Sequence, residues 1–447
     1  MKRACFVLLV VMSLAACVVA LDRQPNADYH ARRMALAAKL NGGVALLFAP
    51  TEGPDEVHGF RQDDNFYYLT GLEQSGAALL IAPQAEPAPG AEGATARPYT
   101  EILFLPARLP MLEKFVGVRL GPDDPQAAQV TGFDRVDSYD KMGADLAAAL
   151  KGHKRTVYTD LPSPGKTSLS EAPLVFFQRS NALPFASYEE VRTVIEKQRT
   201  FKDPGEIALI QKAIDASVAA QFAAMKAIKP GVNERDIAAV LRYEWARRGC
   251  ERESYFPIVG SGLNSTVLHY SADTAQMQAG DVVVIDAACE YSMYSSDITR
   301  TMPVSGKFTA RQREIYDIVL GAQQAAIAAF VSGKSNMKRD DPNSLWKVAR
   351  EYIDSHGKDL QGKPLGQYFT HGLGHYVGLA VHDPNDYEVP FGPGSVFTIE
   401  PGIYIPEEKI GVRIEDTFYV DPSGKLINMS AALPHTADDV ERAMRGK

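Results

Sequence analysis

Four acidic residues in the second half of the sequence stand where apolar runs end. Three of them directly follow short, mostly apolar runs and one comes eleven residues after the first; the four are Asp286, Asp297, Glu400 and Glu415. An ionised carboxylate at the end of a buried strand costs several kcal/mol unless a cation faces it. A single arginine could explain one such acid, but too few cations stand nearby for all four. We therefore expect metal at this place.

Four carboxylates and one imidazole form a hard, oxygen-rich donor set that suits Mn²⁺, Zn²⁺ or Co²⁺. The surplus of bridging oxygens favours two ions, and two divalent ions about 3.5–4 Å apart can activate water and polarise a carbonyl. Hydrolysis is the reaction class that this chemistry indicates. His371 and His375 are spaced like a zinc pair on a helix, but Gly372 and Gly374 between them disfavour a helix. We expect one metal ligand from this pair.

The acids lie in a region that predicts long helices and short strands. A helix should begin at the Asp203 cap and end before Pro230. On a predicted strand Arg413 and Glu415 would share a face, so the arginine could orient a carboxylate. The other predicted elements of this region are helices over 233–249 and 309–330 and strands over 282–285, 396–399 and 412–420.

Residues 22–195 alternate β-rich and helical runs and predict a separate N-terminal domain, followed by a second domain over 200–447. The fold class is therefore expected to be α/β (α+β). Residues 83–98 are expected to form a solvent loop between two paired strands. Phe66, Tyr67 and Tyr68 are interpreted as sheet core, and no repeat of fixed period is present. The strands expected in the first domain are 44–48, 77–82, 101–105 and 156–160.

The composition of the 447-residue chain is that of a globular protein, with 45% hydrophobic and 23% charged residues. Lys+Arg 47 against Asp+Glu 55 gives a net charge of -8, which offers no basic field to nucleic acid or to an anionic membrane surface. Four cysteines are too few for a disulfide scaffold. We expect Cys250 and Cys289 to be buried small hydrophobes rather than part of a disulfide framework.

The N-terminus reads as an export signal, because Lys2 and Arg3 precede an apolar run. Leu14-Ala-Ala-Cys17 is typical of a bacterial lipoprotein cleavage site, so we expect residues 1–16 to be removed and Cys17 to carry lipid. Cleavage after Ala20 or an uncleaved anchor are the alternatives, although the run is short for a membrane span. The expected location is outside the cytoplasm, as a periplasmic or cell-envelope lipoprotein.

Several motifs resemble, in order and spacing, those of the Xaa-Pro aminopeptidase (aminopeptidase P) and prolidase group of the pita-bread metallopeptidase family, M24. They are Ile285-Asp286-Ala-Ala-Cys-Glu-Tyr, Ser296-Asp297-Ile-Thr-Arg, His371-Gly-Leu-Gly-His375, Val381-His382-Asp383, Thr398-Ile-Glu-Pro-Gly402 and Val412-Arg-Ile-Glu-Asp416. The segment from Phe60 to Gly71 resembles the hallmark of the family's N-terminal domain. The resemblance implies a creatinase-like N-terminal domain followed by a pita-bread catalytic domain.

The resemblance also implies site residues at the matching positions. Asp297 and Glu415 would bridge two metal ions, and Glu400 would also serve as general base; the implied metal ligands are Asp286, Asp297, His375, Glu400 and Glu415. His269 and His382 match histidines that contact the substrate. His371 and Arg413 match positions that either take part in catalysis directly or support the metal ligands. Tyr404 matches a residue near the site. The family commonly has an aspartate where this sequence has Asn65, so a substrate or subunit contact made by that aspartate need not be present here.

The expected function is metal-dependent hydrolysis of the bond between an N-terminal residue and a following proline. The substrates would be proline-containing peptides with a free N-terminus, and the cofactors two divalent ions, Mn²⁺ ahead of Zn²⁺ or Co²⁺. A prolidase, which cleaves only dipeptides, shares every ligand and is the first alternative. A non-catalytic peptide-binding lipoprotein on the same fold is a distant one. Family resemblance also implies a homo-oligomer, as dimer or tetramer.

Overall fold

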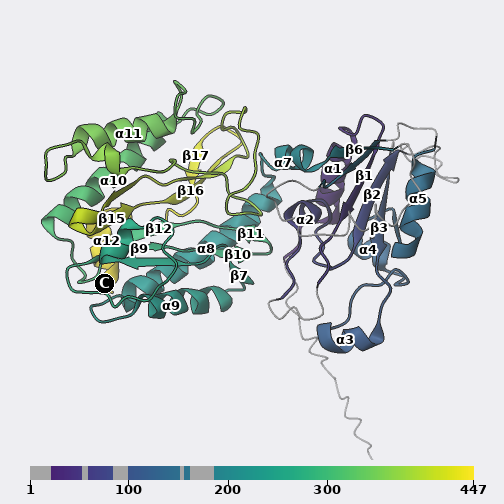
Figure 1. The fold of residues 1–447 in the computed structure, drawn as a ribbon, viewed down its shortest axis with the longest axis horizontal. Coiled ribbons are helices and arrows are strands. Elements are labelled where there is room, and N and C mark those ends of the chain that lie inside the picture. Colours follow the sequence, from purple (N-terminus) through teal and green to yellow (C-terminus); the bar gives the residue numbers. More distant parts are fainter. Residues whose placement is uncertain (1–21, 53–58, 84–98, 152–155, 162–185, 447) are drawn as a thin grey trace, which may run out of the picture.

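A computed structural model of the protein describes residues 22–52, 59–83, 99–151, 156–161 and 186–446. The expected signal segment with Cys17 lies outside these residues, as does the loop predicted over 83–98 apart from Pro83, which ends a strand. Two units lie side by side, one built from the described residues up to α7 and the other from α8 to the C-terminus (Figure 1). Helices flank sheets in both, which agrees with the expected mixed α/β class.

The first unit is built on a six-stranded sheet in the order β4-β3-β2-β1-β5-β6. Its three central strands β1, β2 and β3 are antiparallel, and β4, β5 and β6 each join a neighbour in parallel. All four predicted strands are present. The elements are α1 (Asn26–Ala37), β1 (Val44–Phe48), α2 (Asp64–Thr70), β2 (Ala78–Pro83), β3 (Tyr99–Leu105), α3 (Pro110–Val116), α4 (Ala127–Thr131), β4 (Arg135–Ser138), α5 (Met142–Ala149), β5 (Thr156–Thr159), β6 (Ser187–Glu190) and α7 (Arg192–Gln198).

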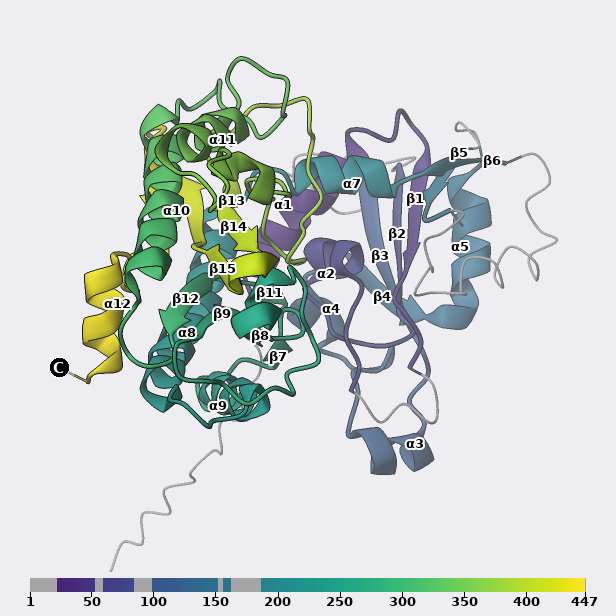
Figure 2. The same cartoon turned by 60° about the vertical axis from the view of Figure 1, so that its left-hand side comes forward.

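Strand β1 shows why this sheet is stable. All five of its residues are buried, because helices cover both faces of the sheet (Figure 2). Since successive side chains alternate between faces, Ala45 and Leu47 join one hydrophobic cluster and Val44, Leu46 and Phe48 join another. The first cluster continues into the second unit, so the two units share a hydrophobic core.

The aromatic residues Phe66, Tyr67 and Tyr68 are buried as expected, but they lie in helix α2 and not in the sheet. The prediction of a strand position was wrong. Asp63 caps the helix by accepting a hydrogen bond from the Phe66 amide, and Gly71 ends it in the left-handed conformation with a φ of 62°. These local signals decide for a helix although aromatic residues favour strands.

The second unit carries four small antiparallel sheets and long helices, of which α8 runs through its centre (Figure 1). The strand orders are β11-β10-β7, β12-β9-β8, β13-β16-β17 and β14-β15. The elements are α8 (Pro204–Ala227), α9 (Glu234–Ala246), β7 (Arg252–Glu253), β8 (Ile258–Ser261), β9 (Val282–Asp286), β10 (Cys289–Tyr291), β11 (Tyr294–Ser295), β12 (Thr299–Pro303), α10 (Ala310–Ala329), α11 (Leu345–His356), β13 (Val396–Ile399), β14 (Gly402–Ile405), β15 (Ile410–Arg413), β16 (Asp416–Val420), β17 (Leu426–Asn428) and α12 (Ala437–Met444).

The three predicted helices of this unit are present as α8, α9 and α10, and each begins with a capping box. Asp203 accepts a hydrogen bond from the Glu206 amide, and the Glu206 side chain accepts one from the Asp203 amide. Within the described part of the chain, α8 alone has the length and hydropathy of a membrane span. Since 56% of that stretch is buried inside the protein, it is a core helix.

The prediction of one strand over 412–420 was wrong. Strand β15 ends at Arg413, and β16 begins at Asp416 in a different sheet, so Ile414 and Glu415 form a break between two strands. The aliphatic pattern hides this break because Val412 and Ile414 are both fully buried. The break frees Glu415 from the regular alternation of a strand.

Cys250 and Cys289 are buried, as expected, but they form a disulfide bond, with Cα atoms 6.1 Å apart. The expectation of two separate small hydrophobes was wrong. Cys250 follows α9, and Cys289 begins β10, which pairs with β7 just after Cys250. Because 39 residues separate the cysteines, their proximity depends on tertiary pairing that no local pattern announces.

This bond gives the first testable prediction. Reduction or the substitution Cys250→Ser should lower the free energy of unfolding by about 2–4 kcal/mol, because the open loop regains entropy in the unfolded chain. Urea titration of oxidised, reduced and Cys250→Ser protein measures the loss. Thiol titration after denaturation without reductant should find two fewer free thiols than with reductant. Equal thiol numbers in the two samples would contradict the pairing.

Candidate metal centre

The four predicted acids lie at points where strands leave one sheet and the chain passes on to another. Asp286 is the last residue of β9, and Asp297 lies just before β12, its antiparallel neighbour. Glu400 directly follows β13, and Glu415 lies in the break between β15 and β16. Strand ends place backbone rigidly and leave the side chain free to point into a cavity. The four acids thus come from two strand pairs that converge on one place.

All nine residues predicted as ligands or catalytic groups line a single cavity of about 650 Å³. His375 Nε2 lies 3.3 Å from Asp297 Oδ2 and 3.4 Å from Glu400 Oε1. Ligand atoms of Asp297, His375 and Glu415 all lie within 4.8 Å of one another, a spacing that can hold a metal ion. The nine residues are His269, Asp286, Asp297, His371, His375, His382, Glu400, Arg413 and Glu415.

His375 is held as a ligand would need to be. Its Nδ1 lies 3.1 Å from the carbonyl of Tyr376, which can only accept a hydrogen bond, so the proton of the neutral ring belongs on Nδ1 and the Nε2 lone pair faces the acids. The carbonyl of His375 accepts a hydrogen bond of 2.9 Å from the amide of Thr398, which lies two residues before Glu400. His371 does not reach the same point, because its Nδ1 lies 3.9 Å from Glu400 Oε2.

Arg413 orients one acid and a tyrosine. Its Nη2 donates to Asp286 Oδ2 over 2.7 Å and its Nη1 donates to the Tyr404 hydroxyl over 2.8 Å. His371 Nε2 lies 2.9 Å from the same hydroxyl. Arg413 therefore orients a carboxylate, as expected, although Asp286 and not Glu415 is its partner. Tyr404 links the arginine to His371.

Two side chains at the site were missed by the sequence analysis. The Tyr255 hydroxyl lies 2.5 Å from Asp286 Oδ1 and 2.6 Å from Asp297 Oδ1, and the Thr299 hydroxyl donates to Glu415 Oε2 over 2.7 Å. Tyr255 stands in a segment that matches none of the motifs, so no sequence signal marked it. Thr299 follows Asp297 by two positions, which on an extended chain points both side chains the same way.

The acids carry more negative charge than the protein neutralises. Burial and the neighbouring carboxylates raise the pKa of Glu415 well above its usual value. Burial raises the pKa of Glu400 to about 7, with Asp297 adding to the rise and His375 opposing it. Burial opposes charge on His375 too, yet Asp297 and Glu400 raise its pKa to about 9. Each shift shows a site that attracts positive charge.

The donor set therefore fits divalent metal. Among the described residues, Arg413 and His375 are the cationic groups within 4 Å of the four acids, apart from the longer approach of His371 to Glu400. Two such groups cannot balance four carboxylates. Carboxylate oxygens with one imidazole suit Mn²⁺, Co²⁺ or Zn²⁺.

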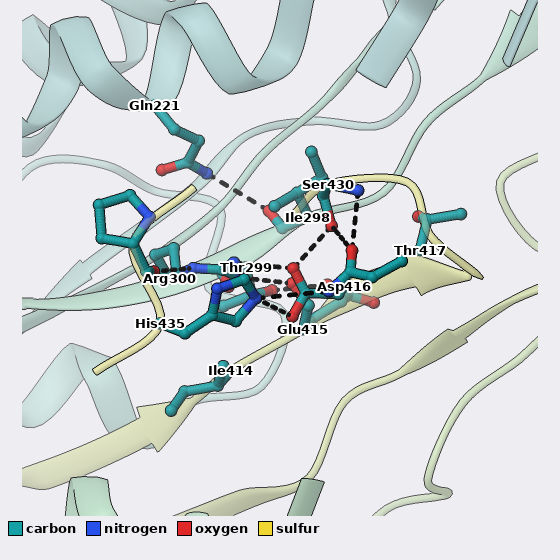
Figure 3. Close-up of polar contacts among 12 residues, drawn as sticks. Gln221, Ile298, Thr299, Arg300, Ile414, Glu415, Asp416, Thr417, Ser430 and His435 are labelled. Carbon is teal, nitrogen blue, oxygen red and sulfur yellow. Dashed lines mark hydrogen bonds and ion pairs between the residues drawn. The ribbon is translucent and has the colours of Figure 1, made fainter. Parts of the chain in front are cut away.

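A second buried layer fixes the strand break that carries Glu415 (Figure 3). Arg300 Nη1 donates to the Glu415 carbonyl over 2.7 Å, and its Nη2 donates to Asp416 Oδ1 over 2.7 Å. His435 and Ser430 also hydrogen-bond the Asp416 carboxylate. Although burial alone would raise it, Arg300 and His435 hold the pKa of Asp416 well below its usual range. Asp416 therefore stays ionised and fixes the break.

Asn65 lies outside the cavity lining and belongs to a contact between the two units. Its Oδ1 accepts a hydrogen bond of 2.8 Å from Arg199 Nη1, and Arg199 Nη2 donates to Asp383 Oδ1 over 2.5 Å. Lys202 also donates to Asp383. Because Asp383 follows His382 in the chain, this contact steadies the loop that brings His382 to the cavity.

Comparisons with known proteins identify the family. The chain matches the models of metallopeptidase family M24 over residues 208–422 and of the aminopeptidase P N-terminal domain over residues 29–158. It is 33% identical to the Xaa-Pro aminopeptidase of Haemophilus influenzae, over 94% of this chain and 97% of that one. It is 32% identical to human Xaa-Pro aminopeptidase 3, over 89% of this chain and 80% of that one. Zinc-substituted Escherichia coli aminopeptidase P in complex with product has a similar structure, with a TM-score of 0.81, 29% identity and coverage of 95% and 99%. The chain therefore belongs to the aminopeptidase P family of M24 metallopeptidases.

Proposed function

We propose that this protein is a metal-dependent Xaa-Pro aminopeptidase, which hydrolyses the bond between an N-terminal residue and a following proline. The observation that carries the proposal is the convergence of Asp286, Asp297, His375, Glu400 and Glu415 on one cavity. Relatives that span nearly the whole chain are named for this activity.

The five converging residues would hold two divalent ions, for which we propose Mn²⁺ first. Bound ions of this kind polarise a carbonyl and lower the pKa of water. The ligands are preorganised, because Tyr255 and Arg413 orient Asp286 and Thr299 orients Glu415. A ligand oriented in this way loses less entropy when it binds a metal.

Glu400 is suited to accept a proton from the attacking water. Its carboxylate lines the cavity, where it can reach a water molecule, and without metal, burial raises its pKa to about 7. One of its oxygens, Oε1, is anchored by the Thr398 hydroxyl over 3.3 Å. His382 stacks edge-on against His375 with ring centroids 4.3 Å apart, and burial lowers its pKa. We assign His382 and His269 to hydrogen bonding of the substrate carbonyl as charge develops on it.

The cavity walls suit a short peptide with proline. Phe256, Ile258, Leu268 and Val381 provide an apolar surface beside the acids, onto which a pyrrolidine ring can pack. The acidic end of the cavity attracts the free amine of the N-terminal residue. Relatives that span nearly the whole chain are named Xaa-Pro aminopeptidases, so we propose an aminopeptidase rather than an enzyme restricted to dipeptides.

We also propose that the protein is exported and anchored through lipid on Cys17. The support is the sequence alone, with its basic start, apolar run and Leu14-Ala-Ala-Cys17. A homo-oligomer is proposed on family resemblance.

The base assignment predicts a large effect of Glu400→Gln. We expect kcat for an Xaa-Pro-Xaa tripeptide to fall by about 10²–10⁴, because the amide cannot take the proton. Metal content, measured on the same samples, separates loss of the base from loss of an ion. Glu388→Gln is a matched control, since the Glu388 side chain is 84% exposed. Unchanged turnover in metal-loaded Glu400→Gln would overturn the assignment.

The raised carboxyl pKa values predict how stability depends on pH without metal. The pKa of Glu400 rises from 4.5 to about 7 on folding, so its contribution is fully present below about pH 4.5 and is lost as the pH rises through 7. Glu415 changes in the same direction. The melting temperature of chelated protein should therefore fall from pH 5 to pH 8, and Mn²⁺ should restore it most at pH 8. A chelated protein that is most stable at pH 8 would contradict the charge imbalance, and Glu400→Gln should flatten the profile.

Substrate length tests the choice between aminopeptidase and prolidase. We expect an Xaa-Pro-Xaa tripeptide to be cleaved after its first residue, and its N-acetylated form to resist, because the acidic site receives a free amine. An Xaa-Ala-Xaa tripeptide is the control for proline. Cleavage of the Xaa-Pro dipeptide alone would make the protein a prolidase. Chromatography of the reaction mixtures measures how much of the first residue is released from each peptide.

A further inference from the structure

Two glutamines are buried within long helices, where an amide needs partners. Gln221 of α8 is 0% exposed and Gln323 of α10 is 1% exposed. A buried amide without hydrogen bonds costs several kcal/mol, so a glutamine at such a place needs an explanation. The partners of both side chains are backbone carbonyls next to the predicted metal ligands.

The Gln221 amide holds the two aspartates together through their neighbours. Its Nε2 donates to the carbonyl of Ile285, which precedes Asp286, and to that of Ile298, which follows Asp297, each over 3.3 Å. Figure 3 shows the side chain reaching from its helix to Ile298. Both acceptors are carbonyls, so the NH₂ group must face them.

The Gln323 amide makes the corresponding contacts to the two glutamates. Its Nε2 donates to the carbonyls of Ile399 and Ile414, the residues directly before Glu400 and Glu415, over 3.0 and 3.4 Å. It also lies 3.0 Å from Asp416 Oδ2, in the layer fixed by Arg300. Each glutamine thus joins the two segments that carry one pair of acids.

Both glutamines donate at places where two sheets separate. Next to Gln221, β9 and β12 belong to one sheet and β10 and β11 to another. Next to Gln323, β13 and β16 belong to one sheet and β14 and β15 to another. The Ile298 carbonyl also accepts a hydrogen bond of 3.3 Å from the Ala287 amide, so the Gln221 side chain adds a second donor there and ties that carbonyl to the one before Asp286. The same geometry turns the acid at each division out toward the cavity.

We propose that Gln221 and Gln323 are positioning residues for the metal site, each setting the separation of one pair of acids. The inference rests on the proposed function, because it takes these acids as metal ligands. Gln221 governs Asp286 and Asp297, and Gln323 governs Glu400 and Glu415. Loss of an amide lets the two strand ends drift apart, and the carboxylates then meet the ions in poorer geometry.

The test compares Gln221→Met and Gln323→Met with Gln62→Met. Methionine keeps the side-chain length and removes the donor. Gln62 is a close control, because it is 0% exposed and its Nε2 also donates to two carbonyls, those of Leu72 and Gln74, but in the first unit. Mn²⁺ affinity by titration calorimetry, melting temperature, kcat and KM are measured on all proteins.

We expect Mn²⁺ affinity to fall about 10–100-fold in the two site variants and to stay within twofold in Gln62→Met, at a similar loss of melting temperature. The asparagine variants keep the amide one methylene short, and should lose several-fold in affinity even where a methionine variant fails to fold. Wild-type affinity in both asparagine variants, or in methionine variants that lose only stability, would overturn the inference. Absence of Mn²⁺ binding and turnover in the wild type would instead refute the proposed function.

Discussion

Four carboxylates share one cavity although each repels the others and burial penalises the charge of all. Arg413 and His375 neutralise only part of that negative charge, as the raised pKa values of Glu400 and Glu415 show. A fold can hold such a group in place only if the backbone beneath it is rigid, because the side chains would otherwise move apart or take up protons. The architecture of the second unit follows from this demand. Its sheets end where the acids stand, and buried polar side chains fix those ends.

The support comes in two corresponding halves. In each half a long helix contributes one buried glutamine, two strands separate, and one acid stands beside each strand end. The halves differ in their finer supports: Tyr255 bridges the two aspartates, whereas Arg300 and Asp416 fix the break beside Glu415. The sequence shows no repeat because the correspondence lies in backbone geometry, which many different side chains can build.

Much of this could be predicted from local patterns. Three of the acids were recognisable because each directly follows a short, mostly apolar run, and the capping boxes of α8 and α9 mark their helix starts. What failed depended on tertiary contacts. Apolar residues stand on both sides of the break at Ile414 and Glu415, so the sequence does not mark it. The disulfide joins residues 39 apart, and Tyr255 reaches the aspartates from a segment without a motif. Phe66, Tyr67 and Tyr68 lie in a helix and not in a sheet, because the Asp63 cap and Gly71 delimit a short helix whose buried residues are aromatic.

The first unit also supports the site, through contacts with the loop that carries His382. Arg61 of that unit donates to the carbonyl of Leu379, and Arg199 joins Asn65 to Asp383, which follows His382. Buried ion pairs of this kind add little net stability, since the cost of desolvation offsets most of the Coulomb attraction. They are favourable only when the two charged groups are closely and correctly placed. Burial opposes it, yet Arg199 and Lys202 lower the pKa of Asp383, so the pair stays charged near neutral pH. The loop with His382 is therefore set by the packing of one unit on the other, and the asparagine at position 65 keeps a place in that contact as a neutral acceptor.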